Sequence, residues 1–183
     1  LVLCNDKGEV IEGDNEVEDT AFFIHSRIHL GAPHAICVLH THMPYATSIT
    51  LLEDGKLEMM EQNALLFDGR IAYDDEYEGL ALASDEGDRL ARKIGNKSIL
   101  FMASHGVVVA GPTVADAFND LYYLERASMF QVLAKSQGGK LRTISDRVRQ
   151  ETKAQFVDEA PKLASRHFSA LRRVPVSYTH LTL

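Results

Sequence analysis

Cysteine is scarce in this sequence, which has only Cys4 and Cys37 among its 183 residues. Two thiols do not make a disulfide framework, so a reducing compartment, the cytoplasm, is expected. No apolar run approaches the roughly 20 residues of a membrane-spanning helix. Lys and Arg form no cluster, and the net charge is -7. An acidic chain without a basic patch is a poor partner for nucleic acid or for an anionic membrane.

The composition is that of an ordinary globular protein, with 45% hydrophobic and 25% charged residues. A chain of this length suits one domain with a single sizeable core. We expect that domain over residues 1–141, followed by a helical tail over 142–175. Residues 176–183 resemble read-through sequence and are expected not to belong to the natural fold, so His180 is excluded from any site. Because the chain begins at Leu1 rather than Met, we expect the N-terminal part of the domain to be missing.

Apolar residues at helical spacing, with capping residues before them, predict helices at several places along the chain. These helices cover residues 19–30, 84–94 and 112–137, with tail helices over 142–171. A further helix can begin at Pro44 and run to Thr50. The helix over 112–137 is the longest, and it ends at Gly138-Gly139, a pair typical of helix ends.

Nearly continuous apolar runs predict buried strands between these helices. The strands cover residues 35–39, 99–103 and 107–110. Residues 1–10 have the pattern of a hairpin, and Asp68-Gly69 indicates a second hairpin turn between 64–67 and 70–73. Helices and strands that alternate without repeats indicate an α/β fold, in which helices cover a sheet.

Two histidines follow the first buried strand directly. Alternate residues of a strand point to the same face, so His40 and His42 present two imidazoles side by side. Imidazole nitrogens suit zinc and related transition metals. Two ligands alone do not make a metal site, and the alternative is a pair of polar residues on an exposed strand end.

A third histidine, His105, follows the second buried strand and precedes Gly106, where the chain can turn tightly. Open α/β sheets place ligands at the ends of their strands. On spacing alone, a loop histidine with its own hydrogen bonds is the stronger interpretation. With this residue the sequence offers three candidate metal ligands: His40, His42 and His105.

Five segments between Phe22 and Gly139 resemble the class II aldolase/adducin superfamily in their order and spacing. The segments are IHSRIH at 24–29, VLHTHMP at 38–44, AYD with YEG within 72–79, SHG at 104–106 and YYLERA at 122–127. Each segment alone is weak, but together they are specific. The resemblance is to the branch that contains adducin heads and their bacterial relatives, including metal-dependent decarboxylases.

This resemblance implies a three-layer α/β/α fold with a mostly antiparallel central sheet, usually assembled as a homotetramer. In the aldolase branch, the histidines that match His40, His42 and His105 bind zinc. The resemblance therefore implies a divalent metal here, zinc in the first place and manganese or iron as alternatives. Antiparallel pairing comes from the family and not from the apolar pattern.

The sequence departs from the sugar-phosphate aldolases at the position of their acid/base glutamate. An ungapped count back from His40 places Ala21 there, and alanine cannot transfer a proton. The same count places His25 and His29 on one helical face, one turn apart. His29 is the candidate substitute, because histidine donates protons near neutral pH. The alternative is a packed histidine bonded to the backbone. The phosphate-binding loops of those aldolases precede the region present here.

Other residues match the family without a clear role. Tyr73 and Tyr77 match family positions, but tyrosines can also be core residues with satisfied hydroxyl groups. Glu125 also matches, and its alternative is an ion pair or a cap on a neighbouring helix. Glu61 and Gln62 lie in a segment that faces a neighbouring subunit in family tetramers.

Three functions are compatible with these residues. The first is a metal-dependent lyase that cleaves a carbon–carbon bond, by retro-aldol reaction or decarboxylation, through a metal-stabilised enolate of a small carbonyl or carboxylate substrate. The second is a non-catalytic adducin-like scaffold or binding domain, and the third is a related dehydratase or epimerase. Three convergent imidazoles argue against a purely structural role, and Ala21 argues against an ordinary sugar-phosphate aldolase. The lyase is therefore the preferred interpretation.

Overall fold

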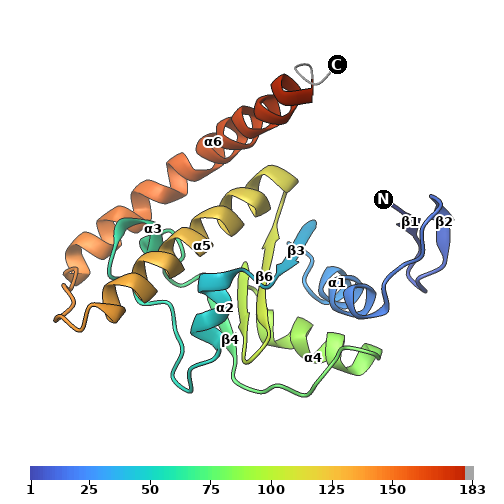
Figure 1. Ribbon diagram of the computed structural model, residues 1–183, viewed down its shortest axis with the longest axis horizontal. Coiled ribbons are helices and arrows are strands. Elements are labelled where there is room, and N and C mark those ends of the chain that lie inside the picture. The colour runs from blue at the N-terminus through green and yellow to red at the C-terminus, as the bar shows by residue number, and fades with distance from the viewer. Residues whose placement is uncertain (180–183) are drawn as a thin grey trace.

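A four-stranded sheet forms the centre of the structure, a computed structural model that describes residues 1–179 (Figure 1). Its strand order is β3–β6–β5–β4. The strands are β3 (Cys37–Thr41), β4 (Ile71–Asp74), β5 (Ile99–Met102) and β6 (Gly106–Gly111). Strand β6 pairs antiparallel with both β3 and β5, whereas β4 and β5 run parallel. The prediction of a mostly antiparallel sheet is therefore confirmed.

The central strands β5 and β6 are buried along their whole length, and their side chains alternate between two separate cores. Leu100 and Val108 enter the core covered by α1 (Asp19–Gly31) and α4 (Ser84–Ile94). Ile99 and Val107 enter the core on the other face. The helices on that second face are α2 (Pro44–Thr50), α3 (Gln62–Leu65) and α5 (Val114–Ser136). Helices thus cover both faces of the sheet, which confirms the predicted three-layer α/β/α fold.

Local sequence accounts for the helix ends. The carboxylate of Glu18 accepts a hydrogen bond from the backbone N–H of Ala21 at 2.6 Å, which caps α1. The hydroxyl of Thr113 caps α5 in the same way. Helix α4 ends at Gly95, whose φ of 53° lies in the left-handed region that favours glycine. The predicted helices over 19–30, 84–94 and 112–137 are confirmed with small shifts at their ends.

The predicted hairpin around Asp68-Gly69 is wrong. Gly69 does turn the chain with a φ of 79°, but the segment before it contains α3 and no strand, and β4 pairs with β5 instead. Ala64 and Phe67 are at most 1% exposed and belong to the core on the α5 side of the sheet. A short apolar run without periodicity fits a strand and a buried helical turn equally well, which is why the prediction failed.

The two ends of the chain lie outside the central layers (Figure 1). Strands β1 (Leu3–Cys4) and β2 (Val10–Glu12) form the predicted N-terminal hairpin. The predicted tail helices form one helix, α6 (Asp146–Thr179), which packs along α5. The expected boundary between 175 and 176 falls inside this helix, and His180 lies outside the described residues. No helix within residues 1–179 is both long enough and apolar enough to span a membrane.

Candidate metal centre

Strand β3 places two histidines on one face of the sheet. Val38 belongs to the core under α1 and α4, and His40 lies two positions further along β3. His42 lies four positions after Val38, one residue past the end of the strand. Both imidazoles therefore project from the α1/α4 side of the sheet. They do so at the strand's carboxyl end, where the chain leaves the sheet for α2.

The turn between β5 and β6 brings the third histidine to the same place. Ser104 has a φ of 54° and is the one residue other than glycine with a positive φ in the described part of the chain. Its backbone N–H donates to the carbonyl of Thr50 at 3.0 Å, which fixes the turn just before His105. At Gly106, a Cβ atom would lie 2.6 Å from the carbonyl oxygen of Thr41 and 2.8 Å from Cδ2 of His42. Glycine there allows β6 to approach the His40–His42 strand closely.

The three imidazoles converge. One nitrogen from each of His40, His42 and His105 lies within 4.8 Å of the other two. Their ring centroids are 4.8 to 5.0 Å apart. The Nε2 atoms of His40 and His42 are 3.3 Å apart. Two nitrogens bound tetrahedrally to zinc at about 2.05 Å are separated by about 3.3 Å, so these residues fit a shared metal ion.

Hydrogen bonding and burial prepare the rings of His40 and His105 to act as ligands. His40 Nδ1 donates to the carbonyl of Val107 at 3.0 Å, which leaves Nε2 with its lone pair free. Burial, together with the neighbouring charges of His40 and His42, lowers the pKa of His105 to about 4. Burial also lowers the pKa of His40, against the opposing effect of the Val107 carbonyl. Neutral imidazole is the form that binds metal.

A carboxylate on α5 fixes the segment that follows His42. Glu125 accepts hydrogen bonds from the backbone N–H groups of Tyr45 at 3.0 Å and Ala46 at 2.8 Å. These are among the unpaired N–H groups at the start of α2, so Glu125 acts as a cap supplied by a neighbouring helix. Of the two alternatives to a family role for Glu125, an ion pair or a cap, the structure shows the cap.

The structure does not bring His29 to the three converging histidines. The exposed His29 bonds through Nδ1 to the carbonyl of Ala35 at 2.6 Å, two residues before β3 begins. Along β3, the first strand position, 37, is already about 10 Å from position 40. The contact with Ala35 lies before that first position and is therefore well separated from His40. His25, one turn earlier in α1, is half-buried. Its pKa is lowered by burial and then by the charges of His40 and His29, so His25 lies within electrostatic reach of the centre.

The two matched tyrosines have different environments. Tyr73 packs against Phe101 with ring centroids 5.5 Å apart, and its hydroxyl accepts a hydrogen bond from Leu57 N–H at 3.1 Å. This is the satisfied core tyrosine of the alternative interpretation. Tyr77 is 53% exposed, and its ring centroid lies 6.3 Å from that of His105. Tyr77 therefore borders the candidate metal centre.

In the segment expected to face a neighbouring subunit, Glu61 caps α3 through hydrogen bonds from the N–H groups of Asn63 and Ala64. Gln62 is exposed.

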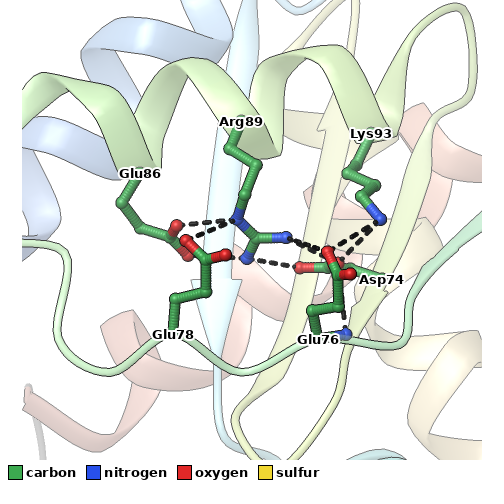
Figure 2. A network of polar contacts seen from close by, with 6 residues as sticks. All are labelled: Asp74, Glu76, Glu78, Glu86, Arg89 and Lys93. Carbon is green, nitrogen blue, oxygen red and sulfur yellow. Dashed lines mark hydrogen bonds and ion pairs between the residues drawn. The ribbon is translucent and has the colours of Figure 1, made fainter.

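A cluster of charged residues lies beside the centre, and no pattern in the sequence predicts it. Figure 2 shows Glu86, Arg89 and Lys93 extending from α4 toward Asp74, Glu76 and Glu78, which lie at the end of β4 and just after it. We call these six residues the Arg89 cluster. Asp74 belongs to a matched family segment, but nothing in the sequence pattern connects it with α4.

Comparisons with known proteins agree with this architecture. The sequence profile of the Class II Aldolase and Adducin N-terminal domain matches residues 1–132. The decarboxylase NovR of Streptomyces niveus is 31% identical over 133 residues, which are 73% of this chain and 49% of that protein. Human beta-adducin is 34% identical over 145 residues, which cover 76% of this chain and 19% of the adducin.

Among solved structures, an aldolase II superfamily protein from Pseudomonas syringae is similar with a TM-score of 0.83 and 30% identity. The similarity covers 94% of this chain and 69% of that one. The chain spans about half the length of the bacterial curated relatives that it matches.

Proposed function

The chain belongs to the class II aldolase and adducin family, and we propose that it acts there as a metal-dependent lyase that cleaves a carbon–carbon bond. The observation that carries this proposal is the convergence of three imidazoles, two from the end of β3 and one from the turn between β5 and β6. A domain used only for binding other proteins has no need of three imidazoles, two half-buried and one exposed, whose nitrogens converge on one point.

His40, His42 and His105 would hold the divalent metal, zinc in the first place and manganese or iron otherwise. When bound, such an ion supplies Lewis-acid polarisation of a substrate carbonyl or carboxylate oxygen. The chain's own contribution is to favour the neutral form of His40 and His105 by burial, which lowers the pKa of both, and to fix His40 through the Val107 carbonyl. The exposed Tyr77 lies beside His105, with ring centroids 6.3 Å apart.

The proton for the cleaved carbon is proposed to come from a histidine of α1. Ala21 is exposed and carries no ionisable group, so the residue at the position of the aldolase glutamate cannot transfer a proton. His29 remains a candidate donor through its free Nε2. His25 is the better supported of the two, because the charge of His40 affects its pKa while the Nδ1 of His29 is held beside Ala35.

A small carboxylated substrate fits this arrangement better than a sugar phosphate. Decarboxylation needs a polarised carboxylate or carbonyl and a proton donor, and the similarity to a protein named a decarboxylase supports it. Retro-aldol cleavage of a sugar phosphate would require the acid/base group that Ala21 lacks. We therefore place decarboxylation ahead of sugar-phosphate cleavage.

An assay of the metal-loaded protein against both substrate classes tests this order. We expect turnover with hydroxylated or aromatic carboxylates and little with sugar phosphates, since an acid/base group contributes about 10²–10⁴-fold. His25→Asn should lower turnover about 10²-fold or more, and His29→Asn should lower it less. Metal content measured on the same samples is the control. Robust cleavage of a sugar phosphate would refute this ranking.

The alternative function is an adducin-like scaffold, supported by the 34% identity to beta-adducin. Bound metal without turnover of either substrate class would favour this alternative over the lyase.

We also propose that the protein is a cytoplasmic homo-oligomer, and a tetramer in particular. Both cysteines are free thiols, as is usual in a reducing compartment. Leu51, Leu52, Leu80 and Leu82 are each at least 62% exposed, which is more apolar surface than one chain covers. Multi-angle light scattering at micromolar concentration should give about four times the chain mass of 20.3 kDa. A mass equal to that of one chain would contradict the proposal.

A further inference from the structure

The inner part of the Arg89 cluster is a buried ion pair. The side chain of Asp74 is fully buried and that of Arg89 is 13% exposed. Two guanidinium nitrogens of Arg89 each lie 2.7 Å from one of the two carboxylate oxygens of Asp74. Glu86 takes a third contact, from Nε of Arg89 at 2.7 Å. A planar guanidinium with several contacts has a fixed orientation, so Arg89 is a rigid element of the structure.

The outer part of the cluster reaches the segment that follows β4. Arg89 lies 3.8 Å from the carboxylate of Glu76 and 3.7 Å from that of Glu78. Lys93 adds a contact of 3.5 Å to Glu76. The backbone of the same segment is also held, because Asp74 Oδ1 accepts a hydrogen bond from the N–H of Glu76 at 3.4 Å. Three ion pairs and one backbone contact therefore tie residues 76–78 to α4 and β4 (Figure 2).

Tyr77 lies between the two tethered glutamates. Glu76 and Glu78 are both directed toward Arg89 (Figure 2), whereas the ring of Tyr77, the residue between them, lies near that of His105. The two ring centroids are 6.3 Å apart. The backbone carbonyl of Asp74 also accepts from Ala103 N–H at 2.8 Å, so the same residue contacts the turn that carries His105.

We propose that Arg89 is a positioning residue that holds the 76–78 segment in place and so keeps Tyr77 beside the three-histidine centre. The stability of the fold does not require Glu76 and Glu78, whose side chains are 64% and 59% exposed. Exposed ion pairs of this kind add little to folding. Their effect is local order, in a segment that would otherwise be a mobile loop beside the candidate centre.

The sequence makes this order measurable, since it contains no tryptophan. Tyr77→Trp would place a single fluorescent reporter at the relevant position. In that background we expect Glu76→Gln with Glu78→Gln to lower the steady-state anisotropy of the reporter clearly and to raise its quenching by acrylamide about twofold. The urea midpoint should remain unchanged. Arg89→Lys keeps the charge but loses the planar fork, and should lower the anisotropy in the same direction.

The matched control is Glu151→Gln with Glu159→Gln, which breaks two exposed ion pairs on α6, with Arg147 and Lys162. This control should leave the anisotropy unchanged. Hydrogen exchange without the reporter is the second measurement, and amides 76–79 should exchange about fivefold faster in the Glu76/Glu78 variant. Unchanged anisotropy and exchange in that variant would overturn the proposal. Neither measurement needs metal or substrate, so the result is independent of the proposed lyase activity.

Discussion

His40→Ala combined with His42→Ala should abolish divalent metal binding, from about one ion per chain to none. The two residues supply two of the three converging nitrogens, and their Nε2 atoms are 3.3 Å apart. With both removed, only His105 remains, and one imidazole does not hold zinc or manganese at protein concentrations used in purification. Elemental analysis of desalted protein would measure the change.

The matched control is His34→Ala. This exposed histidine contacts the carbonyl of Lys97 at 2.8 Å, away from the converging rings. It should leave the metal content at the wild-type level. A well-folded wild-type protein without metal, after growth and purification with added zinc and manganese, would refute the metal centre and with it the proposed lyase.

Arg89→Met should destabilise the protein by about 3–5 kcal/mol, the usual cost when one partner of a buried ion pair is removed. Asp74 would be left as a fully buried carboxylate with only Lys93, at 3.3 Å, to compensate its charge. Urea unfolding of the two proteins would give the difference. Lys135→Met, which breaks the half-exposed pair with Glu58, should change the free energy of unfolding by less than about 1 kcal/mol. A loss below that value for Arg89→Met would contradict the role assigned to the buried pair.

The same pair should make wild-type stability depend on acid. Burial would raise the pKa of Asp74, but the hydrogen bonds and charge of Arg89, with those of Lys93, outweigh it and hold that pKa below its usual value. A depressed carboxyl pKa contributes stability that is fully present above the unfolded value of about 3.9. The contribution is lost as the pH falls through the folded pKa. Arg89→Met should therefore show a weaker loss of stability below about pH 4 than the wild type does.

The sequence predicted the parts of this site that depend on one element at a time. The pairing of His40 with His42 follows from the two-residue repeat of a strand, and the turn at His105-Gly106 follows from a glycine after an apolar run. Where the strands lie relative to one another is a tertiary property. From the apolar pattern alone, His105 is more easily explained as an ordinary loop residue. Only the family resemblance predicts that it lies close to His40.

The same reasoning explains what the sequence could not place. The count that put His25 and His29 on one face of a helix contains no information on how that helix aligns with β3. Hydrogen bonding shows that His29 lies beside Ala35, before the strand starts. Arg89 lies on a helix with many charged residues, and only the packing of α4 against β4 distinguishes it from its neighbours. For 64–67, burial against α5 decided between a helical turn and a strand.

The hydrogen bond between His40 and Val107 joins positions that are 67 residues apart in the chain. His42 and His105 lie on the same two segments, so they also bring these distant parts of the chain together. In the unfolded chain, a ligand shared by these histidines would have to close a long loop, which costs conformational entropy. In the folded protein the two segments are already held together, so binding there carries no such cost. With such a ligand bound, the three histidines would also act as a cross-link, and its binding would be coupled to the pairing of β3 with β6.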